Sequence, residues 1–268
     1  MIRADYHTHT YYCDGNNTPK EMIERALELG LEYYGFSSHC CTDLPYEILT
    51  DEEEYISDCK RIREEYKDRI NILIGMEMEN LLGKCNHKDV EYTIGSTHYL
   101  LDNGEYLCLD YSREELDSIC RSHFDGDYYK LVKAYYETEA DVVKNTDCTF
   151  IGHFDLITKF NEGFVIYDEN DKRYTDPALE ALSVLKGYGV PFEINTSQFS
   201  RKKKSEMYPS MNILKKMREM GCEIIINSDA HSPSMILSGF EEAVSRAKEC
   251  GFNHVNMLTE KGFVQIPI

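Results

Sequence analysis

The chain alternates short apolar, β-branched runs with segments of helical periodicity, and this alternation restricts its fold more than any other feature. The pattern predicts parallel strands joined by helices. We expect strands at residues 2–7, 33–37, 70–77, 92–96, 149–152, 191–195 and 223–227. The 268 residues contain no repeat, low-complexity linker or composition break. We therefore expect one α/β domain over residues 1–268, a length that suits a barrel of strands and helices.

The helices are expected between these strands, and the first has the clearest start. Thr18 can cap it, Pro19 suits the first helical position and Glu21 completes a capping box. Gly30 is expected to end this helix in a left-handed conformation. Segments 101–126 and 159–175 are polar and irregular, so they are expected to be loops over one face. Further helices are expected at residues 51–67, 127–144, 176–188, 209–220 and 233–250.

Composition restricts the location and the partners of the chain. The 48 acidic and 29 basic residues give a net charge of −19, which disfavours binding to nucleic acid or to an anionic membrane. No apolar run reaches the roughly 18 residues of a membrane span. Ten cysteines without a C-x-x-C pair, behind an N-terminus with no apolar signal region, indicate reduced thiols in a cytoplasmic protein. An anionic substrate would need a site with locally positive charge. The oligomeric state stays open.

Histidines and carboxylates gather at the ends of the expected strands. His7 and His9 are two residues apart on a strand, so both imidazoles project from one face, where one metal can accept both. Asp229 and His231 repeat this spacing after the last strand. In parallel α/β folds this rim carries the active site, and imidazoles mixed with carboxylates suit zinc, iron or manganese. The other candidates of this kind are Asp14, His39, Glu77, His98 and His153.

These motifs, in this order, resemble the polymerase and histidinol phosphatase (PHP) superfamily. The motifs are His7-Thr8-His9-Thr10, Asp14-Gly15, Ser37-Ser38-His39, Gly75-Met76-Glu77, Gly152-His153-Phe154-Asp155 and Ser228-Asp229-Ala230-His231. The resemblance extends from Asp5 to about Ser234 and is strongest to the monofunctional histidinol-phosphate phosphatases. It implies a distorted seven-stranded (β/α) TIM-like barrel of the PHP type. It also implies three divalent transition-metal ions, which we expect to be zinc, iron or manganese.

The resemblance further implies a role for each candidate residue. The first ion would be held by His7, His9, Glu77 and Asp229, the second by Glu77, His98 and His153, and the third by Asp14, His39 and His231. Glu77 would therefore bridge two ions. Glu77, Asp229 and His231 are the expected catalytic residues.

Such a centre would provide the positive site that the acidic chain otherwise lacks. Three divalent ions outweigh three carboxylates and a bridging hydroxide, so a phosphate monoester dianion could span the ions while that hydroxide attacks phosphorus. Arg201 opens the basic run 201–204 and is the expected phosphate contact, because its guanidinium fork matches phosphate geometry. Lys159 lies where relatives carry a second basic phosphate contact, and we expect it to bind substrate as well.

The expected function is that of a metal-dependent phosphomonoesterase, which hydrolyses L-histidinol phosphate to L-histidinol and phosphate in histidine biosynthesis. Its partner would be a small phosphorylated substrate, with no nucleic acid and no membrane. One alternative is a related phosphoesterase for another small ester or an oligonucleotide. An amidohydrolase-type deaminase or amidase is another, although that class usually has a bridging carboxylated lysine where this chain has Glu77. A third is a degenerate barrel used for metal-dependent binding, against which the complete ligand set argues.

Overall fold

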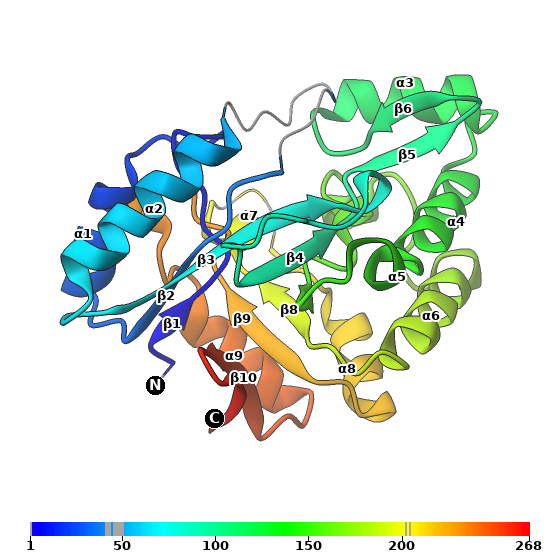
Figure 1. The fold of residues 1–268 in the computed structure, drawn as a ribbon. Helices are drawn as coiled ribbons and strands as arrows, with labels where there is room; N and C mark the ends of the chain where they lie inside the picture. Colours follow the sequence, from blue (N-terminus) through cyan, green and yellow to red (C-terminus); the bar gives the residue numbers. More distant parts are fainter. Residues whose placement is uncertain (1, 41–43, 45–50, 202, 204) are drawn as a thin grey trace.

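The computed structural model describes residues 2–40, 44, 51–201, 203 and 205–268, and in this part of the chain nine strands form a strongly curled sheet, of which the first seven in spatial order are parallel (Figure 1). In spatial order these seven are β1 (Ala4–Asp5), β2 (Tyr33–Phe36), β3 (Asn71–Glu79), β4 (Tyr92–Ser96), β7 (Phe150–Ile151), β8 (Phe192–Asn195) and β9 (Ile224–Asn227). Each lies within or beside its expected range. The shortest, β1 and β7, each keep two residues in regular strand geometry.

The first and last of these parallel strands meet beyond their regular residues. The His9 N–H donates to the Ala230 carbonyl oxygen at 2.8 Å, and the Ala230 N–H donates to the His7 carbonyl oxygen at 3.0 Å. These bonds close the curled sheet on the side where the strands end, and they confirm the expected distorted barrel. They also place the segment after β1 directly beside the segment after β9.

The first two helices cover the outside of the barrel next to β1, β2 and β3 (Figure 1). Helix α1 (Pro19–Glu28) starts as predicted, since the Glu21 N–H donates to Thr18 Oγ1 at 3.2 Å and the Thr18 N–H donates to Glu21 Oε2 at 2.8 Å. Helix α2 (Glu52–Tyr66) is capped by Asp51, whose carboxylate accepts the Glu54 N–H. Both helices press an apolar face on the sheet.

The remaining described helices follow the prediction with local differences. They are α3 (Arg113–His123), α4 (Tyr128–Glu139), α5 (Val142–Thr146), α6 (Lys172–Lys186), α7 (Ser197–Ser200), α8 (Met211–Met220) and α9 (Phe240–Glu249). The single helix expected over 127–144 is divided between α4 and α5. The helix expected over 233–250 starts as a short 3₁₀ turn and resumes at α9, because Leu237 and Gly239 adopt positive φ angles of 57° and 80°. All described helices are too short or too polar to span a membrane.

The prediction of loops over 101–126 and 159–175 was wrong in part. Strands β5 (Tyr99–Asp102) and β6 (Glu105–Cys108) form an antiparallel pair, which α3 follows. Their paired residues Leu100 and Leu107 are buried, so apolar packing stabilises a hairpin in a segment whose composition is polar overall. Helix α6 begins at Lys172 because the Asp171 carboxylate caps it. At the C-terminus, β10 (His254–Thr259) pairs with β9, and β11 (Gly262–Pro267) pairs with β10, a hairpin absent from the prediction.

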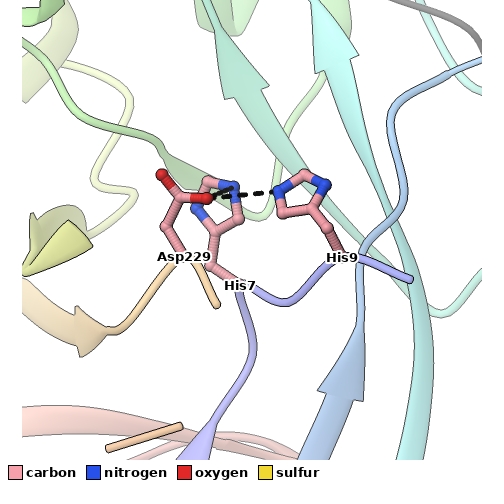
Figure 2. A group of neighbouring side chains, drawn as sticks. All are labelled: His7, His9 and Asp229. Atoms are coloured by element: carbon pink, nitrogen blue, oxygen red, sulfur yellow. Dashed lines mark ion pairs between the residues drawn. The ribbon is translucent and has the colours of Figure 1, made fainter. Parts of the chain in front are cut away.

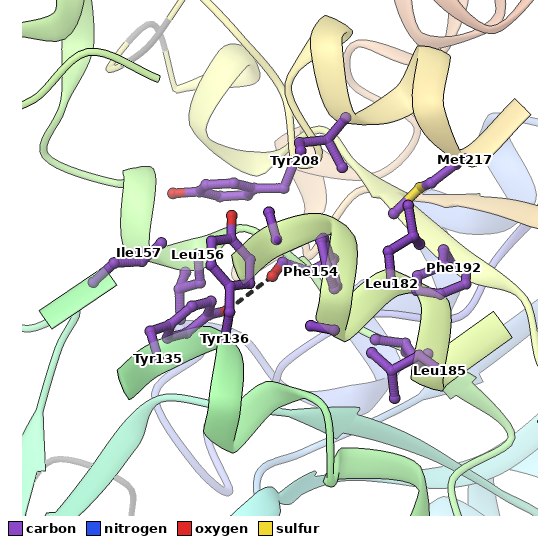
Figure 3. Close-up of a cluster of buried hydrophobic side chains, with 14 of the residues drawn as sticks. Tyr135, Tyr136, Phe154, Leu156, Ile157, Leu182, Leu185, Phe192, Tyr208 and Met217 are labelled. Carbon is purple, nitrogen blue, oxygen red and sulfur yellow. Dashed lines mark hydrogen bonds between the residues drawn. The ribbon is translucent and has the colours of Figure 1, made fainter. Parts of the chain in front are cut away.

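The largest apolar cluster fills the space between the barrel and helices α4, α6 and α8 (Figure 3). Tyr136 on α4, Phe192 on β8 and Phe154 are all buried there. The Tyr135 hydroxyl donates to the Phe154 carbonyl oxygen at 3.0 Å, so the buried phenol keeps a partner. Burying a large aromatic side chain contributes roughly 1.5–3 kcal/mol. Because Phe154 follows His153 directly, this packing fixes the backbone that carries His153.

Candidate metal centre

All nine predicted ligand side chains converge at the end of the barrel where the parallel strands finish. His7 and His9 follow β1, His39 follows β2, Glu77 lies within β3, His98 follows β4, His153 follows β7, Asp229 and His231 follow β9, and Asp14 lies in the turn before α1. The one local difference is that β3 continues past Glu77 to Glu79. Parallel strands expose their ends on one rim, which is why residues far apart in sequence meet here.

The Glu77 carboxylate lies at the centre of this group and is 1% exposed. Imidazole nitrogens surround both of its oxygens: His7 Nε2 and His39 Nδ1 at 3.2 Å and His9 Nε2 at 3.5 Å from Oε2, and His153 Nε2 at 3.0 Å and His98 Nε2 at 3.5 Å from Oε1. The Ser96 hydroxyl donates to Oε1 at 2.7 Å. Burial raises the Glu77 pKa, but the surrounding imidazoles hold it well below its usual value. A carboxylate with both oxygens facing imidazoles is suited to bridge two cations.

Asp229 faces His7 and His9, the two histidines that follow β1 (Figure 2). Its Oδ1 lies 3.3 Å from His9 Nε2 and 3.8 Å from His7 Nε2. Among the described residues, both of these buried nitrogens lack a hydrogen-bond partner. Buried imidazole nitrogens of this kind, directed at two carboxylates, are the donor set that a divalent cation requires. The residues present therefore fit a metal centre.

Asp14 lies at the outer edge of the group, and its side chain is 48% exposed. Its Oδ2 lies 2.9 Å from His231 Nε2, and its Oδ1 lies 3.7 Å from His39 Nε2. The Asp-Gly turn requires the glycine, because a Cβ at Gly15 would lie 2.5 Å from the carbonyl carbon of His9. The Asn16 N–H donates to the His231 carbonyl oxygen at 2.9 Å, which ties this turn to the segment after β9.

Eight of the nine side chains, all except His98, form overlapping groups with closely spaced ligand atoms. These are His7, His9 and Asp229; His7, Glu77 and His153; His9, His39 and Glu77; and His9, Asp14 and His231. His39 stands between the inner and outer groups, since its Nδ1 faces Glu77 and its Nε2 faces Asp14. The buried clusters indicate a metal site, while the division of ligands among three ions stays a prediction.

A pocket opens over this centre, and both predicted substrate contacts lie on its wall. Arg201 Nη2 lies 2.7 Å from His231 Nδ1, and Lys159 Nζ lies 2.9 Å from Asp110 Oδ2. Lys203 lines a separate pocket, and Lys202 and Lys204 of the same basic run lie outside the described residues.

Sequence reasoning did not single out three carboxylates around the centre, of which Glu79 and Glu193 are buried and Asp110 is partly buried. Asp110 reaches the pocket from the chain after the β5–β6 hairpin, a segment expected to be a loop. Glu79 accepts the backbone N–H of His98 at 2.8 Å. Glu193 accepts from His7 Nδ1 at 2.8 Å. Spacing in the sequence was a signal for two of them. Glu79 follows Glu77 by two residues and Glu193 precedes Asn195 by two, so each pair lies on one face of a strand that is otherwise apolar.

Comparison with known proteins identifies the family. Residues 5–197 match the model of the PHP domain. The chain belongs to the PHP domain family. A probable histidinol-phosphatase of Deinococcus radiodurans is 30% identical to it over 92% of this chain and 94% of that protein. A probable histidinol-phosphatase of Schizosaccharomyces pombe is 28% identical over 97% of this chain and 90% of that protein. The histidinol-phosphatase of Bacillus subtilis is 24% identical over 92% of this chain and 100% of that protein.

The PHP fold is shared with solved structures. The crystal structure of histidinol phosphate phosphatase from Lactococcus lactis, described as complexed with zinc, L-histidinol and phosphate, aligns with a TM-score of 0.75 at 20% identity and covers 98% of both chains. The crystal structure of a Listeria monocytogenes protein aligns with the same TM-score at 20% identity and covers 89% of this chain and 99% of that one. Family membership and the buried His and carboxylate cluster together indicate a metal-dependent phosphatase.

Proposed function

We propose that this PHP protein hydrolyses L-histidinol phosphate to L-histidinol and phosphate, as a step of histidine biosynthesis in the cytoplasm. The observation that carries the proposal is the convergence of nine ligand-type side chains with Glu77 at their centre, all but His7 lining one pocket. Relatives that span nearly the whole chain are named histidinol-phosphatases, which supports this substrate over other phosphate esters.

In this proposal the centre would hold three divalent ions, of zinc, iron or manganese. Glu77 would bridge an ion held with His7, His9 and Asp229 to one held with His98 and His153, and the outer ion would be held by the remaining three side chains: Asp14, His39 and His231. When bound, such ions lower the pKa of a coordinated water and neutralise charge on a phosphoryl group. Asp229 and His231 border the pocket, next to the place where a phosphate group would lie.

The pocket wall supplies groups for the rest of the substrate. Arg201 would donate to the phosphate oxygens through guanidinium N–H groups that His231 leaves available, and Lys159 would add a second positive charge. Asp110 is a carboxylate on the same wall, held ionised beside Lys159: burial raises its pKa, and the Lys159 and His98 charges lower it to about 2. A carboxylate there would suit the ammonium group of an amino-alcohol phosphate.

A second candidate function is hydrolysis of a different small phosphate ester by the same centre. Two relatives from Thermoanaerobacter strains, 27% identical over 92% of this chain, are named only as probable phosphatases. This candidate shares the metal ligands and differs in the groups that contact the alcohol portion.

A phosphatase panel on the purified protein separates the two. We expect kcat/KM for L-histidinol phosphate to exceed that for p-nitrophenyl phosphate and for sugar phosphates by about 100-fold, the scale of a site with several polar substrate contacts. Metal content is measured in the same sample. Equal rates for all esters would support the second candidate, and metal-loaded protein without any phosphatase activity would contradict both.

A further inference from the structure

Glu193 lies on β8 beneath the metal centre, is fully buried and is bound by four hydrogen-bond donors. The donors are His7 Nδ1 at 2.8 Å and Asn227 Nδ2 at 3.0 Å on Oε1, and the His153 backbone N–H at 3.0 Å and Asn195 Nδ2 at 2.9 Å on Oε2. One carboxylate therefore contacts the side chain of one proposed ligand and the backbone of another.

The chemistry of these contacts sets the orientation of His7. A carboxylate oxygen accepts, so Nδ1 of His7 must carry the proton that it donates. The other ring nitrogen, Nε2, is then directed at Glu77 and Asp229, at 3.2 Å and 3.8 Å from their nearest oxygens. A metal-binding histidine needs this arrangement, in which one nitrogen donates to a fixed acceptor and the other offers its lone pair.

The two asparagines extend these contacts to the other side of the centre. Asn195 Nδ2 also lies 3.2 Å from Asp229 Oδ2, so the same amide contacts Glu193 and a third proposed ligand. Asn227 Oδ1 accepts the backbone N–H of Tyr6 at 2.9 Å, directly before His7. Glu193, Asn195 and Asn227 together connect the ends of β1, β7, β8 and β9.

We propose that Glu193 is a positioning residue for the metal centre, which fixes the Nδ1–H form of His7 and aligns His7, His153 and Asp229 before any ion binds. This rests on the proposed metal-dependent function. All four partners of Glu193 are donors. A glutamine at this position could accept hydrogen bonds from only two of them, because its own NH₂ group would face the other two donors. Glu79 makes comparable contacts with the single ligand His98, at 2.8 Å to its N–H and 3.2 Å to Nδ1.

The test compares E193Q with a matched variant, D5N. Asp5 is also fully buried and accepts from three donors, which are the Ser228 N–H and hydroxyl and the Leu237 N–H, and none of these belongs to a proposed ligand. Both variants lose one acceptor oxygen in the barrel interior. Metal-free wild type, E193Q and D5N are titrated with Zn²⁺ against a competing chelator, and their melting temperatures are recorded. We expect E193Q to bind Zn²⁺ about 10- to 100-fold more weakly at the tightest site, and D5N to bind within about threefold of wild type at a similar loss of melting temperature.

Equal Zn²⁺ affinity for E193Q and D5N would overturn the proposal. A second measurement needs no variant: long-range ¹H–¹⁵N spectra of Zn²⁺-loaded wild type should show the His7 proton on Nδ1, and a proton on Nε2 would overturn the proposal even if E193Q did not fold. A different result would contradict the proposed function alone: wild-type protein that binds Zn²⁺ with the His7 proton on Nδ1 but hydrolyses no phosphate ester.

Discussion

The inner and outer parts of the metal centre are built in different ways. The inner side chains His7, Glu77 and His153 are at most 4% exposed and are held by buried groups of the barrel, chiefly Ser96 and Glu193. The outer Asp14 is 48% exposed and lies in a turn, and His231 is held by Arg201 from a loop. The barrel itself therefore positions the inner side chains, whereas the positions of the outer side chains depend on a turn and a loop.

Glu77→Gln should have the largest effect of any single substitution, because it removes the charge that both inner ions would share. We expect kcat/KM to fall by about 10³-fold or more, equivalent to ~4 kcal/mol, together with a loss of bound metal. Steady-state kinetics and elemental analysis of the same preparation measure both. Near-normal turnover with normal metal content would mean that Glu77 is not the bridge.

Asp14→Asn should be less severe, because Asp14 would contact one ion only and its side chain is 48% exposed. A fall in kcat/KM of about 10- to 100-fold, with about one ion lost per chain, is expected. The same two measurements apply. The distinction between inner and outer parts would be abandoned if this variant were as inactive as Glu77→Gln.

The contrast between the two parts also shows what the sequence could predict. Residues such as His7, His39 and His153 could be placed because parallel strands end on one rim, so their position after a strand was enough. Asp110 could not be placed, because the apolar pairs that form the β5–β6 hairpin are short and lie in a polar segment.

Contacts between distant segments lay further beyond sequence reasoning. Apart from Asn195 on the same strand, the donors to Glu193 come from three distant parts of the chain, and no spacing rule connects them. In the same way, the 2.7 Å contact of Arg201 with His231 depends on how a loop folds back over the rim. The positions of the candidate ligands at one rim followed from topology, whereas the groups that contact them could be found only in the structure.

Arg201→Met should weaken the use of phosphate esters without changing metal content. A charged hydrogen bond contributes roughly 1.5–3 kcal/mol, so kcat/KM should drop by about 10- to 100-fold. Lys203→Met is the matched control, because Lys203 lines a different pocket and its charge is screened by solvent. Lys202 and Lys204, which the structure does not describe, should likewise matter less individually. If kcat/KM fell by equal, small and salt-sensitive amounts in all four single variants of residues 201–204, this run would attract the substrate through its overall charge. Arg201 would then not be a phosphate ligand.

The smallest effect is expected from the Lys159–Asp110 pair, measured as stability of the metal-free protein against pH. Although burial raises the Asp110 pKa, Lys159 and His98 bring it to about 2, below the ordinary 3.8. A lowered carboxyl pKa contributes stability above pH 3.8 that is lost as the pH falls toward 2, here about 2 kcal/mol. Lys159→Met should weaken this pH dependence, because Lys159 has the largest lowering effect on the Asp110 pKa. Denaturant unfolding at pH 2 to 5 would show it, and an unchanged profile would contradict the pairing.

The central claim, one centre with an inner pair of ions and an exchangeable outer ion, is tested most directly by counting metals against activity. Purified protein is analysed for transition metals and for phosphatase activity in the same sample, before and during stepwise chelation. The account predicts close to three ions per chain, loss of the first ion with partial activity remaining, and no activity once the others are removed. One ion or none in fully active protein would contradict it.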